Sequence, residues 1–138
     1  MIVLDTNVLS ALMRTEPDAV VLGWLDLQAP DAVWTTAVTV FEVQIGLGLL
    51  PAGRRRRTLE SAFERLLAED LEHRVLGFDT SAAVQAARLA AARQKAGRTV
   101  DLRDTQIAGI VSARRATLAT RNPRHFRDLD IAVVDPWS

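Results

Sequence analysis

The chain has 138 residues, of which 49% are hydrophobic and none is cysteine. This length suits a single domain over residues 1–138, and the lack of cysteine excludes disulfides and thiolate-bound zinc. Net charge is zero, without the positive excess that nucleic-acid binders often carry. No stretch reaches the roughly 20 apolar residues that span a bilayer, and no export signal is recognised, so a cytoplasmic location with no membrane contact is expected.

Apolar runs and helical periodicity alternate along the chain. In chain order they predict a strand at 2–4, helices at 8–13 and 18–27, a strand at 32–35, helices at 38–50 and 54–70, a strand at 75–78, helices at 80–96 and 101–115, and strands at 117–120 and 131–134. Asp18 is expected to cap the second helix, and Gly97 to end the fifth. Strands alternating with helices predict an α/β fold, a three-layer α/β/α sandwich over a four- to five-stranded parallel sheet.

Three acidic residues stand in apolar surroundings. Asp5 directly follows the first strand, at the carboxyl end where open α/β sheets bind ligands. Glu42 shares a helix face with apolar neighbours at 38, 45 and 49, and is expected to project toward the core. Asp104 shares its face with apolar residues at 100, 107, 108 and 111. Three buried carboxylates in one small domain require a common compensation, because each costs several kcal/mol when unpaired.

A divalent cation would supply that compensation. Two carboxylates about 4 Å apart repel by roughly 4 kcal/mol at an effective dielectric near 20. Oxygen ligands, with no cysteine and no histidine near them in the sequence, suit Mg²⁺ with Mn²⁺ as a substitute. Each acid also has a simpler explanation: Asp5 as a helix cap, Glu42 as the partner of a buried arginine, and Asp104 as an acid that, with Asp101, favours a helix start.

Four segments in this order resemble the PIN-domain ribonucleases, in particular VapC-type toxins. They are Asp5-Thr6-Asn7 after the first strand, Glu42 in Val-Phe-Glu-Val-Gln-Ile-Gly, Asp104-Thr105-Gln106-Ile107-Ala108, and Leu118-Ala119-Thr120-Arg121-Asn122 with His125-Phe126. The resemblance covers essentially the whole chain and implies a PIN-like fold. It also implies a metal-dependent endoribonuclease that hydrolyses RNA phosphodiester bonds, as the toxin component of a VapBC-type toxin–antitoxin module.

The resemblance implies that Asp5, Glu42 and Asp104 form the catalytic and metal-binding centre. Asp5 and Asp104 are the expected direct ligands, and Glu42 is expected to act through a water molecule. Family members often carry a fourth acid where this chain has the uncharged Asn122. Asp101, one turn before Asp104, is an alternative source of that charge. Five further residues are expected to orient the carboxylates by hydrogen bonding or to position the substrate, namely Thr6, Asn7, Asp101, Thr120 and Asn122.

The implied partners are RNA and a VapB-like antitoxin that fills the acidic site. Promoter DNA is expected to bind only through the antitoxin complex, and a homodimer is usual in the family. A groove for an antitoxin helix is predicted from six apolar residues, which are Leu9, Leu12, Met13, Leu47, Leu49 and Leu50. Trp137 is expected in the core or at a dimer contact. The sequence names neither the RNA nor the number of metal ions.

Other features leave alternatives open. Residues 54–57 are four consecutive arginines, read either as a solvated helix start or as an RNA guide. His73 and His125 lack ligand spacing and are expected to be structural. Asn122 favours a catalytically weak PIN domain that binds RNA or a partner. A haloacid-dehalogenase-type phosphatase also begins with an aspartate after its first strand, but the second aspartate of that family is Asn7 here, and the only lysine, Lys95, lies within a predicted helix.

Overall fold

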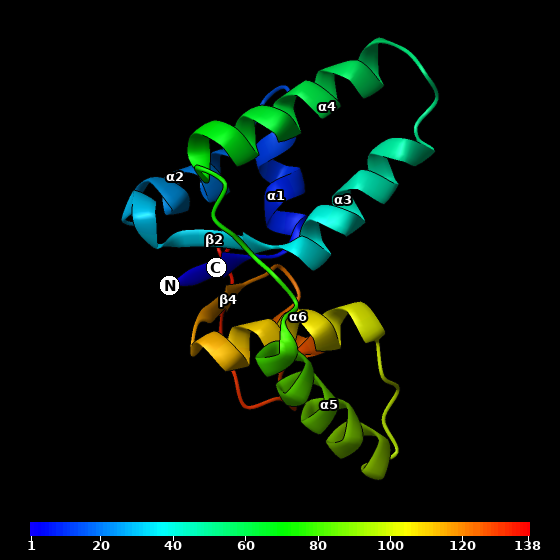
Figure 1. Cartoon of the computed structure of the whole chain (residues 1–138). Helices are drawn as coiled ribbons and strands as arrows, with labels where there is room; N and C mark the ends of the chain where they lie inside the picture. The colour runs from blue at the N-terminus through cyan, green and yellow to red at the C-terminus, as the bar shows by residue number, and fades with distance from the viewer.

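The computed structural model describes all residues, 1–138. Five parallel strands form one sheet in the order β3-β2-β1-β4-β5 (Figure 1). The strands are β1 (Ile2–Leu4), β2 (Val33–Thr36), β3 (Val75–Leu76), β4 (Thr117–Ala119) and β5 (Ala132–Val134). From β1 the chain builds outward on one side through β2 and β3, and then returns to the other side with β4. The ends of β1 and β4 therefore meet at the topological switch point of the sheet, where such folds bind ligands.

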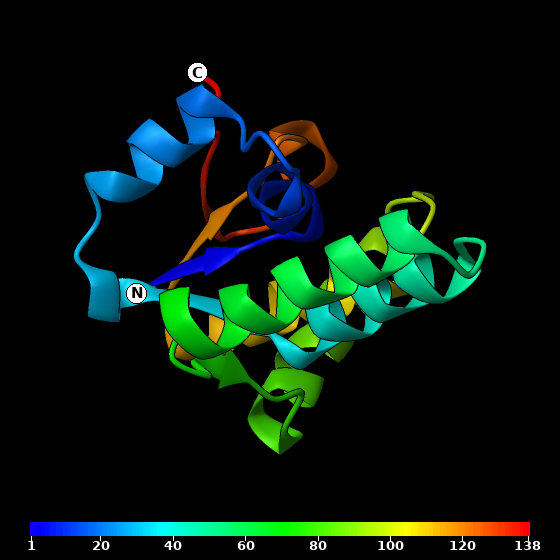
Figure 2. The same cartoon turned by 90° about the horizontal axis from the view of Figure 1, so that it is seen from above.

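Six helices cover the two faces of the sheet, so the predicted three-layer α/β/α fold is confirmed. They are α1 (Thr6–Met13), α2 (Ala19–Asp26), α3 (Ala37–Leu49), α4 (Arg54–Arg65), α5 (Thr80–Lys95) and α6 (Leu102–Arg114). In Figure 1, α1, α2 and α4 lie above the sheet, and α5 and α6 lie below it. The far ends of α3 and α4 extend past the sheet, as the view from above in Figure 2 also shows.

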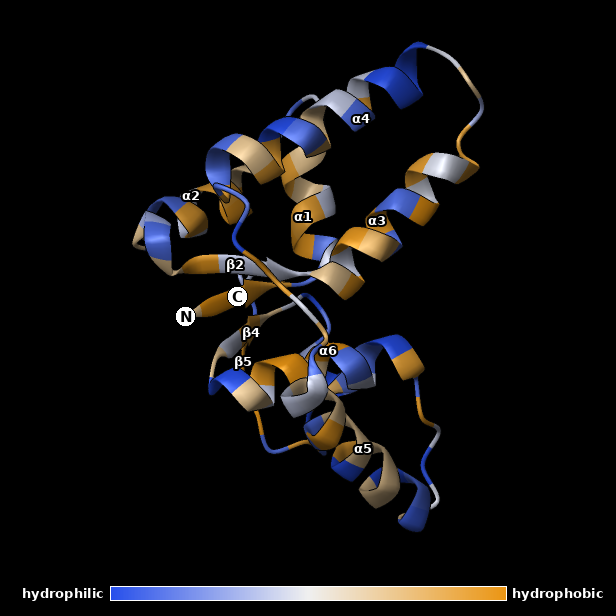
Figure 3. Ribbon diagram, viewed as in Figure 1, coloured by the Kyte–Doolittle hydropathy of each residue, from blue (hydrophilic) through white to orange (hydrophobic).

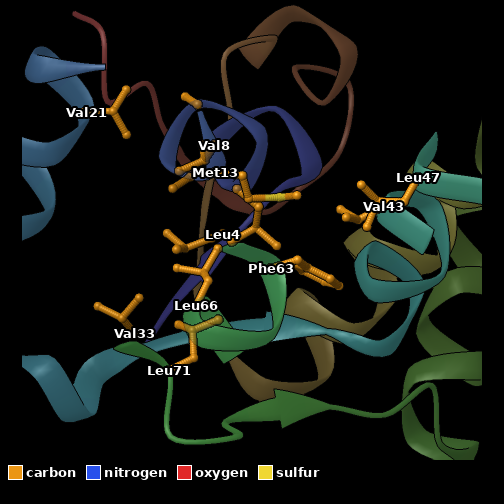
Figure 4. Packing of buried hydrophobic residues seen from close by; sticks show 13 residues of the cluster. Leu4, Val8, Met13, Val21, Val33, Val43, Leu47, Phe63, Leu66 and Leu71 are labelled. Carbon is orange, nitrogen blue, oxygen red and sulfur yellow. The ribbon is translucent and has the colours of Figure 1, made fainter. Parts of the chain in front are cut away.

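The two faces of the sheet have separate hydrophobic cores because successive strand side chains point to opposite faces. Leu4 packs in the core with α1 to α4, while its neighbour Val3 packs with α5 and α6. Figure 4 shows Phe63 of α4 and Leu66, directly after α4, beside Leu4. On the other face, α5 and α6 approach so closely that a Cβ on Gly109 would lie 2.6 Å from the Ala82 carbonyl oxygen, so only glycine fits there.

Several predicted boundaries shift by local chemistry. The first helix starts at Thr6 rather than 8, because the Asp5 carboxylate accepts a hydrogen bond from the Thr6 amide and caps it. The helix predicted over 54–70 is α-helical only to Arg65 and ends in a π-helical turn, Leu66–Asp70. The strand predicted at 75–78 is reduced to two residues. No helix combines the length and apolarity needed to cross a bilayer.

The predicted antitoxin groove is largely wrong. Leu9, Met13 and Leu47 are fully or almost fully buried in the core, where no partner reaches them. Leu12 and Leu50 pack against the same core, and only Leu49 is exposed. Helical periodicity gives the apolar face of a helix but not what covers it, and here α4 covers most of the predicted groove.

Candidate acidic active site

Asp5 lies at the sheet's switch point, where β1 ends and α1 begins. Its side chain is 6% exposed. One carboxylate oxygen accepts the Thr6 amide at 2.8 Å and the other accepts the Thr120 hydroxyl at 2.8 Å. These two bonds fix the carboxylate orientation, one from the first residue of α1 and one from the residue that follows β4. Burial raises the pKa of Asp5, and the Thr120 and Thr6 hydrogen bonds only partly oppose that shift.

Thr120 is the centre of a hydrogen-bond network around Asp5. Its hydroxyl accepts the Asn122 amide at 3.2 Å and the Asn7 side-chain amide at 3.5 Å. The Asn7 side-chain oxygen in turn accepts the Arg121 amide at 3.0 Å. Residues from the start of α1 and the end of β4 are therefore tied together beside the carboxylate. The Thr6 hydroxyl, in contrast, is buried without any hydrogen-bond partner.

Glu42 on α3 and Asp104 on α6 face the same region from two other elements. Their side chains are 23% and 25% exposed. Burial raises the pKa of Glu42, and the negative charge of Asp5, with smaller effects of Asp104 and Asp101, raises it further. Burial likewise raises the pKa of Asp104, followed by repulsion from Asp101 and Asp5. The three acids, 37 and 62 residues apart in sequence, thus lie within electrostatic reach of one another.

Nearby basic side chains balance this charge only weakly. Arg103, itself half exposed, lies 3.9 Å from the Glu42 carboxylate. The Nδ1 atom of His125 lies 3.6 Å from an Asp104 oxygen. His125 was expected to be structural, but the loop after β4 brings it to the acidic centre. That placement follows from the chain path rather than from any ligand spacing.

The reasoning that selected Glu42 was partly wrong. Its apolar face was expected to point to the core, but Ile45 and Leu49 on that face are exposed, and so is Phe41 beside it. The buried stripe of α3 is made by Val38, Thr39, Val43 and Leu47. Glu42 therefore borders solvent at the edge of an uncovered apolar surface. For Asp104 the expectation is confirmed, since Ile107, Ala108 and Val111 are buried.

The simpler explanations of the acids have mixed outcomes. Asp5 does cap α1, in addition to lying beside the other acids. No buried arginine pairs with Glu42. Asp101 is the N-cap of α6, accepting the Asp104 amide at 2.9 Å, and its side chain is exposed. Asn122 contributes its backbone amide to Thr120, while its side chain makes no hydrogen bond.

The donor set is suited to a hard divalent cation, although it is not closed around one. Three carboxylates with raised pKa values and one orphaned threonine hydroxyl meet at one edge of the sheet. All their donor atoms are oxygens, as Mg²⁺ prefers. No three His, Cys, Asp or Glu side chains stand close enough together to form a ready-made ligand group. A bound ion would have to draw the carboxylates inward.

Sequence reasoning missed the ion pair that the buried Arg93 forms beside this centre. Arg93 on α5 donates to both oxygens of Asp128, at 2.8 and 3.0 Å, and also to the His125 carbonyl oxygen. It thereby anchors the loop that carries His125. The signal was available: Arg93 continues the buried stripe of an alanine-rich helix, at the spacing of Ala82, Ala86 and Leu89.

Comparison with known proteins places these features in a wider group. A family model described as PIN domain matches residues 2–132. Over 137 residues and 98–99% of each chain, the sequence is 39% identical to plasmid stability protein StbB of Pseudomonas syringae pv. tomato and 37% identical to VapC ribonuclease Y4jK of Sinorhizobium fredii. It is 33% identical to toxin FitB of Neisseria gonorrhoeae, over 99% of each chain. The solved structure of FitAB bound to an IR36 DNA fragment superposes with a TM-score of 0.89 and 33% identity, over 100% of this chain and 96% of that one.

Proposed function

Since this chain belongs to the PIN-domain family, we propose that it is an endoribonuclease that hydrolyses RNA phosphodiester bonds, as the toxin of a toxin–antitoxin module. One relative is named a VapC ribonuclease and another a toxin, and both match over nearly the full length of each chain. Because the chain belongs to this family, the alternative of a haloacid-dehalogenase-type phosphatase is dropped. A toxin that acts on RNA would work in the cytoplasm.

The observation that carries the proposal is the unbalanced charge of Asp5, Glu42 and Asp104. Their raised pKa values reflect burial and mutual repulsion, which cost stability in the absence of a ligand. A structural role does not explain why three segments bring like charges together. A bound cation does, because it removes the repulsion and gives the carboxylates a partner.

We assign the metal to Mg²⁺, with Mn²⁺ as a substitute. Asp5 and Asp104 would hold the ion directly, and Glu42 would place a third negative charge beside it. When bound, such an ion polarises a phosphoryl oxygen and lowers the pKa of a water molecule. Asn122 carries no charge, so the loop after β4 adds a neutral hydrogen-bonding group. Asp101 is committed to capping α6 and adds negative charge only at a distance.

The protein's own groups orient the reactants. The Thr120 hydroxyl and the Thr6 amide hold the Asp5 carboxylate in one orientation. Glu42 has the role of proton acceptor from the attacking water, because a carboxylate with a raised pKa takes up a proton more readily near neutral pH.

A cleavage assay tests this proposal. Purified protein is incubated with single-stranded RNA in Mg²⁺, in Mn²⁺ and in EDTA, beside the Asp5→Asn variant. Cleavage is expected in both metals and to be absent in EDTA. Asp5→Asn should lose more than about 100-fold of the rate, since even groups that only orient metal ligands contribute 10- to 100-fold. Equal cleavage in EDTA, or by the variant, refutes the assignment.

A second candidate function is binding of RNA or a protein partner without cleavage. The uncharged Asn122, where family members often have an acid, favours it. The same assay separates the two, because a binder retains RNA in a gel-shift experiment with Mg²⁺ but yields no shorter fragments. Restoring the acid with Asn122→Asp should then produce cleavage.

The proposed partners are a VapB-like antitoxin and a second copy of the chain. The FitAB structure contains bound DNA, which suggests that promoter DNA is bound by the toxin–antitoxin complex, through the antitoxin. The exposed apolar residues of α3, Phe41, Ile45 and Leu49, provide a surface for such assembly. Light scattering of the isolated chain and of Phe41→Ser would test the homodimer.

A further inference from the structure

We propose that RNA leaves the acidic centre along a groove lined by arginines, which runs beside α1 to the start of α4. We call it the arginine track; its residues are Arg121, Arg14, Arg54 and Arg55. The proposal rests on the ribonuclease function above and adds the path of the substrate strand. Two adjoining cavities that share Arg14 carry it.

The first cavity, of about 500 Å³, reaches Thr6 and Asn7, the two residues that follow Asp5. It is lined by Thr6, Asn7, Ser10, Ala11, Arg14, Asp18, Arg121 and Trp137. The Arg121 guanidinium lies over the Trp137 ring, 4.6 Å from its centroid. The Arg121 amide is bonded to Asn7, which ties this arginine to the network around Asp5. Thr6, the first residue of α1, belongs to the same cavity wall.

Trp137 packs against the hydrophobic core, which is one of its two expected placements, and it also lines this cavity. Its indole NH donates to the Asp18 carboxylate at 3.1 Å, which fixes the ring at this cavity. A guanidinium stacked on a fixed indole ring is a cation–π pair with its NH groups directed outward. Such a pair can contact phosphate with the guanidinium fork and a base with its remaining planar surface.

The second cavity, of about 560 Å³, lies between the end of α1 and the start of α4. Arg14 contributes to both cavities, and Arg54, Arg55 and Thr58 line the far wall. From Thr6 to Arg14 the distance along α1 is about 12 Å, at 1.5 Å per residue. The track is thus long enough for a short stretch of nucleic-acid backbone rather than for a single anion.

The charge along the track is poorly neutralised. No acidic oxygen lies within 4.0 Å of Arg54, Arg55 or Arg121. Arg14 forms an ion pair with Asp18 alone, at 3.6 Å, and its side chain remains exposed. The first turn of α4 contains no acid, although acids are favoured there. Figure 3 shows this end of α4 as strongly hydrophilic. Four consecutive arginines therefore add to the positive end of the helix dipole.

RNA fits this surface better than an apolar segment of a protein partner does. Leu59 is the one hydrophobic residue lining the second cavity. Phosphates are repelled by the acidic centre, so a ribonuclease with zero net charge needs cations placed where the strand continues. Arginine forks bind phosphate in two-point contacts. The track supplies them in line with the site of cleavage.

The test compares two double variants that remove equal charge. Arg54→Gln with Arg55→Gln removes half of the track, while Arg88→Gln with Lys95→Gln removes two exposed cations of α5, on the opposite face. The substrate is a single-stranded RNA of about 16 nucleotides. The track variant should raise KM about tenfold with a smaller change in kcat. Its plot of log affinity against log salt should flatten by about 1.4, or 0.7 per lost phosphate contact.

The control variant should match the wild type in both measurements. Thermal melts establish that both variants fold, and the track variant should melt no lower, because it relieves repulsion at a helix start. A KM and a salt slope equal to those of the control overturn the track. A variant that binds RNA like the control but loses its antitoxin assigns the surface to a protein partner, which also overturns it.

A failed cleavage assay would not leave the track untested. RNA affinity is measured by fluorescence anisotropy in the Asp5→Asn background, where no cleavage interferes. If the wild type cleaves no RNA, the ribonuclease proposal fails, and the RNA affinities measured by anisotropy alone decide whether the track binds RNA. Crosslinking from 4-thiouridine in that RNA should map to peptides that contain Arg121, Trp137 or residues 54–58. Crosslinks confined to α5 contradict the track.

Discussion

The negative charges of two carboxylates on either side of His125, those of Asp128 and Asp104, are compensated to very different extents. Asp128 receives two hydrogen bonds from Arg93, with side chains 15% and 7% exposed, and these bonds lower the pKa of Asp128. Asp104, on the other side, has only the exposed His125 ring at 3.6 Å, and its pKa is raised by burial and by like charges. One charge is satisfied within the fold, whereas the other is left to a ligand.

The difference separates structure from function in one small region. A carboxylate whose pKa is lowered stabilises the folded state at neutral pH, and one whose pKa is raised destabilises it. The Arg93–Asp128 pair thus anchors the loop that carries His125. The acidic centre costs stability, which a bound cation would return. Each prediction below tests one side of this contrast.

The largest effect is expected from breaking the satisfied pair. Arg93→Ala should lower the free energy of unfolding by about 3 kcal/mol, because it removes two charge-assisted hydrogen bonds to Asp128, each worth roughly 1.5 kcal/mol. Urea unfolding followed by circular dichroism measures the change. Arg98→Gln is the matched control: Arg98 lies 3.9 Å from the same carboxylate but is exposed, so its loss should cost less than about 0.5 kcal/mol. Equal losses would mean that Arg93 is not the anchor.

Cation binding should restore the stability that repulsion among the three acids removes. At a Mg²⁺ concentration about 100 times its Kd, the wild type should gain about 2.7 kcal/mol relative to EDTA. Asp5→Asn and Asp104→Asn should lose most of that gain, since each removes a proposed ligand. Thermal melts at constant ionic strength provide the measurement. The same Mg²⁺ gain in either variant would place the ion elsewhere.

Two aspartates three residues apart on α6 should respond in opposite directions. In EDTA, Asp104→Asn should stabilise the protein by about 1 kcal/mol, because it removes repulsion from Asp5 and Asp101. Asp101→Ala should destabilise it by about 1 kcal/mol, because it removes the N-cap of the helix. Chemical denaturation of both variants tests this reversal. A destabilised Asp104→Asn would mean that Asp104 is structurally satisfied.

The smallest effect is expected in the pH dependence of stability without metal. As pH falls from 7 through the raised pKa values of Asp5, Glu42 and Asp104, the folded state takes up protons before the unfolded state, so stability should rise by up to about 1 kcal/mol. Below the ordinary range near pH 4, the contribution of Asp128 is lost, because its folded pKa is lowered.

Two variants separate these limbs of the pH curve. Asp104→Asn should show a smaller rise on the first limb, and Asp128→Asn a smaller loss on the second. Unfolding free energies measured from pH 7 to pH 3 in EDTA give both limbs. A wild-type curve that only falls with acid would contradict the repulsion among the three acids.

The sequence by itself determined the elements and their order. Alternating apolar runs and helical stripes located all five strands and all six helices, because backbone hydrogen bonding and burial on one face are local properties. The parallel sheet followed from the alternation of strands and helices. Asp5 and Asp104 stood out in the sequence because charged residues beside apolar runs conflict with local burial. The same reasoning was only partly right for Glu42, since Ile45 and Leu49 on its face are exposed.

Tertiary structure decided what covers each face and which charges meet. Helical periodicity made Ile45 and Leu49 look like core, yet no other element of the chain covers them. Arg93 finds Asp128 35 residues away, and Arg121 finds Trp137 at the end of the chain. Such contacts depend on where the chain path brings distant segments, and on the dielectric surroundings created by packing. Local sequence patterns contain neither the chain path nor the dielectric surroundings.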